Sequence, residues 1–168
     1  MTKRKRKINT TIISLMSIGF LYLGCIKQAR NYSVEFPFQK IEREVLDIIN
    51  GSENKQINLS TLTPFEWDTL YVFKPYTPIK KINRELGFEW NEFKNTNGYN
   101  DDNYNLLIFT YNREVVKYLK WPRDKGDFIK TDKFKYSQNE VTFAPNKEDF
   151  GDQKWVFLYH LPNDSLHR

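Results

Sequence analysis

The chain has 168 residues, of which 16% are aromatic and 28% charged, a composition that indicates one globular domain and excludes a disordered or fibrous chain. Its formal net charge is +5, but Lys3 to Lys7 supply five of its positive charges, and the first 24 residues contain no acid. Removing these five from the 26 basic residues leaves 21, against 21 acidic residues, so the rest of the chain is neutral and lacks the charge that nucleic-acid binding requires.

The N-terminal segment has the order of a secretory signal peptide. The basic run Lys3 to Lys7 is followed by an apolar stretch from Ile12 to Leu23, and then by Gly24 and Cys25. A basic region, a short apolar region and a small residue in this order predict export and cleavage. The apolar stretch is shorter than the about 20 residues that a membrane-spanning helix needs.

The end of this segment, Leu21-Tyr22-Leu23-Gly24-Cys25, resembles the lipobox of bacterial lipoproteins, with Tyr22 where that family prefers Leu. The resemblance implies cleavage before Cys25 and acylation of its thiol and amino group. The protein would then be lipid-anchored and extracytoplasmic, at the cell membrane or the outer membrane. Two alternatives stay open: an uncleaved membrane anchor from Ile8 to Ile26, or an ordinary signal peptide in which Cys25 has no role.

The rest of the chain is expected to form a tether and one domain. We assign residues 1–24 to the signal peptide, residues 25–33 to a lipid-attached tether, and residues 34–168 to a single α+β domain. Its pattern predicts two helices in the N-terminal half, packed on a mostly antiparallel sheet of about five or six strands. The first helix has apolar residues from Ile41 to Ile49, and the second follows Pro78 and ends at Gly87.

The most aromatic stretch of the domain runs from Phe65 to Pro78. Apolar residues on both faces, Phe65, Trp67, Tyr71 and Phe73 on one and Leu70 and Val72 on the other, predict a central strand. Pro75 is expected to end that strand, because proline cannot donate to the ladder. The segment from Trp67 to Thr77 also resembles one found in small uncharacterised bacterial proteins, a resemblance that implies no activity.

The second half of the domain reads as further strands. Tyr104 to Tyr111 and Glu114 to Trp121, joined by Asn112 and Arg113, predict a hairpin. A short strand is expected from Val141 to Ala144, stopped by Pro145, and a polar connection from Asn146 to Gln153. The last strand, Trp155 to His160, is apolar on both faces and is expected in the interior of the sheet.

Several carboxylates are candidates for catalysis. Glu66 and Asp68 would share one strand face about 7 Å apart, which suits acid–base chemistry on a sugar. Asp124 and Asp127 lie in a glycine-containing loop, a candidate site rim, and His160 is the only histidine inside a predicted element. Either pair with His160 would make a hydrolase site. The competing interpretations are an exposed strand start, a self-paired surface turn and a structural histidine.

Tyr76, Thr77 and Lys80 are candidates for ligand binding. They lie where the second helix is expected to begin, and free backbone amides at such a position can bind an anion. The competing interpretation is that Thr77 serves only as the helix cap. Asp101 and Asp102 end an oxygen-rich loop that lacks the residue order of a calcium site, and Cys25 is the only cysteine, so we expect no metal.

These patterns favour a membrane-anchored binding protein. No motif of a known hydrolase or phosphate-binding loop is present, and we expect no cofactor. The favoured function is therefore non-enzymatic binding of an envelope protein or a small ligand near the membrane to which Cys25 attaches, with no nucleic-acid partner. The alternative is a small envelope hydrolase that acts on glycan or peptide through His160 and the carboxylates named above.

Overall fold

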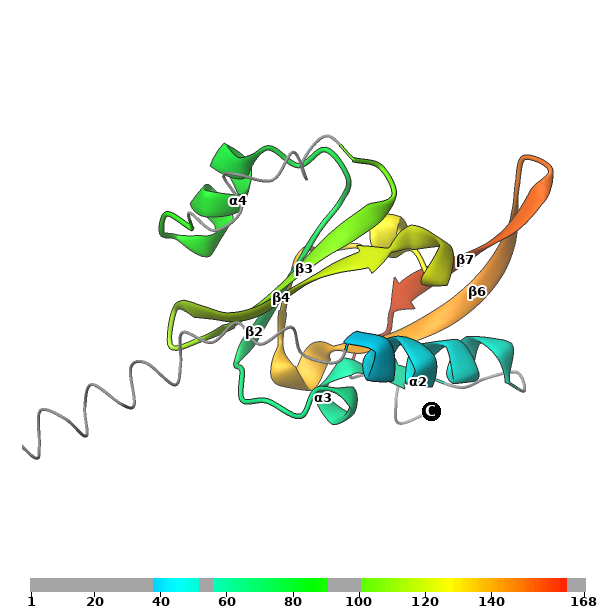
Figure 1. Cartoon of the computed structure of the whole chain (residues 1–168), viewed down its shortest axis with the longest axis horizontal. Coiled ribbons are helices and arrows are strands. Elements are labelled where there is room, and N and C mark those ends of the chain that lie inside the picture. The colour runs from blue at the N-terminus through cyan, green and yellow to red at the C-terminus, as the bar shows by residue number, and fades with distance from the viewer. Residues whose placement is uncertain (1–37, 52–55, 91–100, 163–168) are drawn as a thin grey trace, which may run out of the picture. The chain divides into compact units, whose positions relative to one another are not determined.

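The computed structural model describes residues 38–51, 56–90 and 101–162. Their elements are α2 (Phe38–Asn50), β1 (Ile57–Asn58), α3 (Leu59–Leu62), β2 (Thr69–Phe73), α4 (Ile79–Leu86), β3 (Tyr104–Tyr111), β4 (Glu114–Pro122), η2 (Arg123–Lys125), η3 (Phe128–Lys130), β5 (Lys135–Ser137), η4 (Gln138–Glu140), β6 (Thr142–Phe150) and β7 (Gln153–His160) (Figure 1). The predicted α+β class is confirmed. The predicted signal peptide, lipobox and tether lie outside the described residues.

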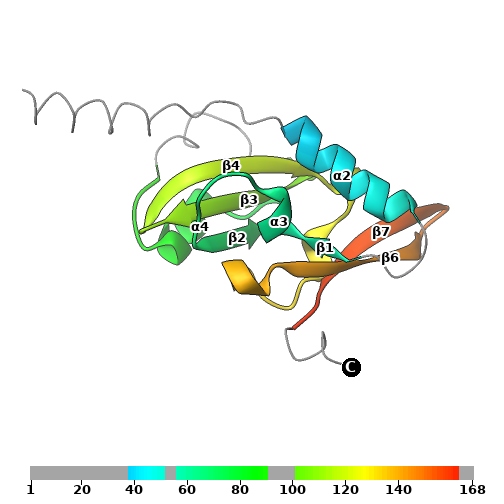
Figure 2. The same ribbon diagram turned by 90° about the horizontal axis from the view of Figure 1, so that it is seen from below.

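The strands form two antiparallel sheets where the sequence predicted one. One sheet has the order β4-β3-β2-β5 and the other the order β1-β6-β7. In both views α2 lies beside the three-stranded sheet, whereas α4 lies at the other end of the described domain (Figures 1 and 2). The seven strands exceed the predicted five or six. A short edge strand was predicted at Ile57 and Leu59, and β1 confirms it at Ile57 and Asn58, whereas Leu59 already begins α3.

β2 is an interior strand of the larger sheet, as predicted. It pairs with β3 on one side and with β5 on the other. Tyr71 and Phe73 pack with Ile82 and Leu86 of α4 on one face. Leu70 and Val72, on the other face, are also buried. The strand is therefore covered on both sides, which explains why its apolar residues do not alternate with polar ones.

The prediction that Phe65 and Trp67 continue the face of Tyr71 was wrong. The strand begins only at Thr69. Both aromatic rings pack edge-to-face on Phe109, with centroids 5.2 Å apart in each case. Phe109 is the β3 partner of Leu70, so its side chain lies on the face opposite Tyr71. The irregular residues before the strand break the alternation on which the prediction depended.

Both predicted helices are present, and each buries its apolar stripe. In α2 the buried residues are Ile41, Val45 and Ile49, spaced by four residues. α4 ends at Gly87, which adopts the left-handed conformation (φ +81°), and its amide bonds the Asn83 carbonyl. Glycine accepts this conformation without the steric cost of a Cβ, so the predicted end of this helix is confirmed.

The hairpin of β3 and β4 is confirmed, with Asn112 (φ +50°) and Arg113 (φ +64°) at its two-residue turn. Two left-handed residues give the turn a twist that matches the twist of the strands. Behind this sheet, Phe128 packs edge-to-face on Trp121 and on Phe143, and Tyr136 also packs on Phe143. These four buried rings join the two sheets into one core.

Three predictions for the C-terminal part were wrong. Pro145 does not stop the strand, because β1 pairs only with Thr142 and Phe143 and leaves the rest of that β6 edge open, where proline is tolerated. The expected polar connection is the end of β6, a turn at Gly151 (φ +63°) and the start of β7. β7 is an edge strand in its sheet order, although the backbone of Asp127 pairs with its outer side.

Candidate functional site

The segment from Lys74 to Pro78 joins β2 to α4. Pro75 and Tyr76 form a turn directly after the strand, and the Thr77 amide and hydroxyl both donate to the Lys74 carbonyl, over 3.3 Å and 2.7 Å. Tyr76 takes the left-handed conformation, with φ +60°. A side chain other than glycine in this region is uncommon, and strained backbone of this kind concentrates at functional sites.

Thr77 does not cap α4. The N-cap position is Pro78, which makes no side-chain hydrogen bond to the helix, and the first turn contains no acidic residue. The alternative interpretation of Thr77 as a cap was therefore wrong, because its hydroxyl is used by the turn that precedes the helix. The positive end of the helix dipole meets neither a side-chain cap nor a carboxylate of its own first turn.

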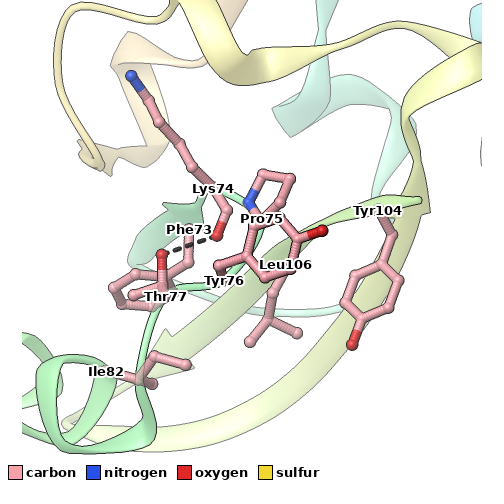
Figure 3. A pocket seen from close by; sticks show the side chains of 8 residues that line it. All are labelled: Phe73, Lys74, Pro75, Tyr76, Thr77, Ile82, Tyr104 and Leu106. Carbon is pink, nitrogen blue, oxygen red and sulfur yellow. Dashed lines mark hydrogen bonds between the residues drawn. The ribbon is translucent and has the colours of Figure 1, made fainter. Parts of the chain in front are cut away.

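A hollow lies between this turn and β3 (Figure 3). Its apolar floor consists of Phe73, Ile82 and Leu106, and the phenol rings of Tyr76 and Tyr104 line its sides. The empty space is about 210 Å³, part of it open to solvent. Because that figure includes open solvent, the enclosed space is far below the about 300–1,000 Å³ of a typical site for a small molecule, and the hollow is a shallow depression of the surface.

The surroundings of the hollow carry positive charge. Lys74 lines it, and Lys80 and Lys81 are exposed in the first turn of α4. None of these three ammonium groups has a hydrogen bond or an ion pair within the described part of the chain. Burial, and secondarily the charge of Asp101, raises the pKa of Tyr104, so its phenol stays protonated at neutral pH. The hollow is thus mostly apolar inside, and Lys74 is the cation among the side chains that line it.

Glu66 and Asp68 do not form a carboxylate pair on a strand. Both precede β2, so the predicted common strand face does not exist. Asp68 accepts hydrogen bonds from the Asn112 amide (2.7 Å) and the Thr110 hydroxyl (3.4 Å), and thereby ties the start of β2 to the end of the β3–β4 hairpin. Glu66 is exposed and forms no hydrogen bond or ion pair among the described residues. The role of Asp68 is structural.

Asp127 lies at the centre of a buried polar cluster. Its carboxylate is fully buried and accepts hydrogen bonds from Arg123 Nε (2.8 Å), Asn105 Nδ2 (3.0 Å), the Ile129 amide (2.9 Å) and Trp155 Nε1 (3.2 Å). The interpretation as a self-paired surface turn was wrong for Asp127, because η2 and η3 fold its side chain inward. Four donors leave this carboxylate little capacity to act as a base. Asp124 is exposed and lies apart from this network.

The His160 side chain is buried, and it contacts none of the carboxylates predicted to act with it. Its Nε2 lies 3.0 Å from the Glu140 carbonyl, which fixes Nε2 as the donor. Its Nδ1 lies 3.3 Å from Asp132 Oδ1, at an angle outside that of a hydrogen bond. The contacts of the described residues connect His160 with Asp132 and not with any of the four predicted carboxylates. They give the hydrolase alternative no shared site.

The remaining candidates from the sequence are the loop that contains Asp101 and the lipidation site Cys25. Asp101 accepts hydrogen bonds from the backbone and side chain of Asn103, and the described residues contain no cluster of three or more possible metal ligands. The loop before Asp101 and Cys25 itself lie outside the described residues. Among the described residues there is no helix long and apolar enough to cross a membrane.

The sequence located one side of the hollow and missed the other. Tyr76 and Thr77, both predicted, line it, and Lys80 follows in α4. Tyr104 and Leu106 come from β3, about thirty residues away, and Phe73 and Ile82 were assigned only to the core. The sequence shows that Tyr104 and Leu106, two residues apart on a strand, lie on the same face of β3. It does not show that β3 pairs with β2, which is what brings them to the hollow.

The fold and the hollow define an α+β domain with a small apolar site at the junction of β2 and α4. No family model matches the chain, and no curated protein or solved structure matches it at a significant level.

Proposed function

We propose that the protein is a lipid-anchored lipoprotein of the bacterial envelope whose α+β domain binds a partner at the hollow between β2 and α4. The basic run, the apolar stretch and Cys25 support the anchoring, because this order is that of an exported lipoprotein. Attachment through two or three acyl chains would be stable, whereas a single chain binds a membrane only marginally.

Tyr76 is the observation that carries the binding function. Its side chain is 58% exposed, although the residue occupies a backbone conformation that costs about 1–2 kcal/mol for any residue with a Cβ. It forms no ring contact or hydrogen bond with the described residues. Folding thus gains little from a tyrosine here, and glycine would fit the turn better. An aromatic ring held beside an apolar hollow is instead suited to contact a partner.

The anchoring is tested by mass spectrometry of the membrane fraction of a bacterium that produces the full chain. We expect a mature protein that begins at Cys25 with acyl chains attached, and a Cys25→Ala variant that lacks them and leaves the membrane fraction. A Cys25→Ala protein that stays in the membrane at the parent level, together with an unmodified Cys25 in the parent, would refute the lipoprotein assignment.

The binding site is tested by placing a photoreactive phenylalanine analogue at position 76 of the full chain and irradiating intact cells. Phe150 is the matched control, since it is 60% exposed and lies in the β6–β7 hairpin, away from the hollow. We expect a discrete cross-linked product from position 76 and none from position 150. Equal cross-linking at the two positions would show only general exposure and would contradict a site at the hollow.

A further inference from the structure

We infer that His160 and Asp132 form a proton-dependent latch between the two sheets, closed when the imidazole carries a proton on both ring nitrogens and open when Nδ1 loses its proton. The inference goes beyond the proposed binding function and depends on neither the hollow nor the lipid anchor. Two observations carry it: His160 Nδ1 is buried without a hydrogen-bond partner among the described residues, and it lies 3.3 Å from Asp132 Oδ1.

His160 lies where the two sheets meet. It is the last residue of β7, and its ring packs on Phe143 of β6 in the same three-stranded sheet, with centroids 5.9 Å apart. On its other side lies Tyr136 of β5, in the four-stranded sheet, with ring centroids 4.9 Å apart. Asp132 precedes β5. A bond between His160 and Asp132 therefore joins the end of one sheet to the edge strand of the other.

The contacts of the imidazole fix its tautomer. A carbonyl can only accept a hydrogen bond, so Nε2, which lies 3.0 Å from the Glu140 carbonyl, carries a proton. A neutral imidazole has one ring proton, so its Nδ1 is then a bare, buried acceptor that faces a carboxylate oxygen, and an unpaired buried acceptor destabilises the fold. A second proton on Nδ1 converts this contact between two acceptors into a charge-assisted donor–acceptor pair.

Asp132 is the charged group without an ionic partner that faces the imidazole among the described residues. Its Oδ1 accepts a hydrogen bond from the Lys133 amide over 3.0 Å, which keeps the carboxylate beside the ring although the side chain is 64% exposed. The charges of Lys133 and Glu140 pair with each other over 2.8 Å. Burial raises the pKa of Tyr136 to about 12, so its phenol is neutral.

The cation that fits between the two side chains is a proton. Protein zinc sites use at least three side chains, and the described residues contain no cluster of three or more possible metal ligands. The exposed side of Asp132 gives a proton from solvent a route to the pair. Because the bonded form holds the extra proton, the latch contributes to stability at low pH, and that contribution is lost as the pH rises and Nδ1 is deprotonated.

The protonation is tested by nuclear magnetic resonance on the full chain in detergent micelles, with isotopically labelled histidine. The chain has two histidines, so a His167→Gln variant assigns the signals of His160. We expect protons on both ring nitrogens at about pH 5.5 and on Nε2 alone at about pH 8.5, values on either side of the ordinary histidine pKa of about 6.5. A bare Nδ1 in the folded protein at about pH 5.5, or a neutral ring protonated on Nδ1, would overturn the inference.

The contribution to stability is tested with Asp132→Asn, which keeps the shape of the side chain and removes its charge. In urea unfolding at about pH 5.5 the variant should raise the unfolding equilibrium constant about threefold to fivefold, a modest effect because Asp132 is largely exposed. At about pH 8.5 it should be at least as stable as the parent, since the asparagine amide can donate to the bare Nδ1.

Asp124→Asn is the matched control, because Asp124 is exposed and has no ion pair within the described part of the chain. Its effect should be the same at both pH values. An equal effect of Asp132→Asn at both pH values would refute the latch. We also expect no change on adding EDTA; if EDTA abolished the difference between the parent and Asp132→Asn, the pair would hold a metal ion and the assignment of a proton would be wrong.

Discussion

Arg123 Nε donates a hydrogen bond over 2.8 Å to the fully buried carboxylate of Asp127, four residues further along the chain. The Arg123 side chain is itself mostly buried, and its Nη1 donates to the Asp102 carbonyl. The same carboxylate binds β3 through Asn105 and β7 through Trp155, which belong to different sheets. The pair therefore joins the two sheets at one point, in a segment that the sequence suggested as a site rim.

Replacing Asp127 with alanine should lower the free energy of unfolding by about 3–5 kcal/mol, because it leaves the buried Arg123 charge and the Asn105 amide without their acceptor. Urea denaturation measures the loss. Asp124→Ala is the matched control, since Asp124 is exposed, and should stay within about 0.5 kcal/mol of the parent. A similar small effect for both variants would show that the cluster does not hold the sheets together.

A side chain at Gly126, next to Asp127, would be both strained and crowded. Its φ is +119°, and a Cβ would lie 3.1–3.3 Å from three atoms of Leu158, which is fully buried. Gly126→Ala should therefore cost about 2 kcal/mol or more, from backbone strain and overpacking together. Gly151→Ala has the strain without the contact, because nothing lies within 4 Å of its Cβ, and should cost about 1 kcal/mol. Thermal or urea unfolding of the two variants should show this order.

Glu140 should make stability depend on pH in the acid range. Hydrogen bonds from Lys133 and Ser137 lower its pKa from 4.5 to about 2. Because the folded-state pKa is depressed, its contribution is present above pH 4.5 and is lost as the pH falls through about 2. The side chain is more than a third exposed, so the contribution is below about 1 kcal/mol. Glu140→Gln should be less stable than the parent near neutral pH and equal to it near pH 2, as measured by urea midpoints; a constant difference would contradict this.

Tyr71→Ala should cost about 3–5 kcal/mol of unfolding free energy, the usual loss for a large buried aromatic. Tyr71 lies in β2, an interior strand, between Ile108 of β3 and Lys135 of β5, and stacks on Phe73. Phe150→Ala, which removes an exposed ring, should cost far less. A Tyr71→Ala protein as stable as the parent would show that the packing between β2 and α4 contributes little.

The sequence predicted those elements whose signal is local. The β3–β4 hairpin and the end of α4 at Gly87 were correct, because a two-residue turn and a left-handed glycine depend on neighbouring residues alone. Pro145 was misread because its effect depends on whether a strand pairs beside it, and β1 is too short to reach it. Whether a proline stops a strand is thus decided by the sheet and not by the residue.

The candidate site shows the same limit. Tyr76 could be found from the sequence because it lies at a turn between a strand and a helix. The burial of Asp127 could not, since its four donors come from segments between residues 105 and 155 that only the fold brings together. For the same reason, the hydrogen bond of His160 to the Glu140 carbonyl and its approach to Asp132 could not be predicted. Thr77 was misread because its hydroxyl could either accept a hydrogen bond from the helix or donate one to the preceding turn, and it donates to the turn.

Tyr76→Gly separates folding from binding at the hollow. Glycine removes a left-handed strain of about 1–2 kcal/mol, and its greater freedom in the unfolded chain offsets about 0.5–1 kcal/mol of that gain. The variant should therefore be at least as stable as the parent in urea denaturation, because the ring is exposed and contacts nothing that the structure describes. Its binding of the envelope partner should nevertheless fall about tenfold, since the exposed ring that would contact the partner is lost. A loss of more than about 1 kcal/mol of stability would instead show that Tyr76 serves the fold, and would remove the reason to place a binding site there.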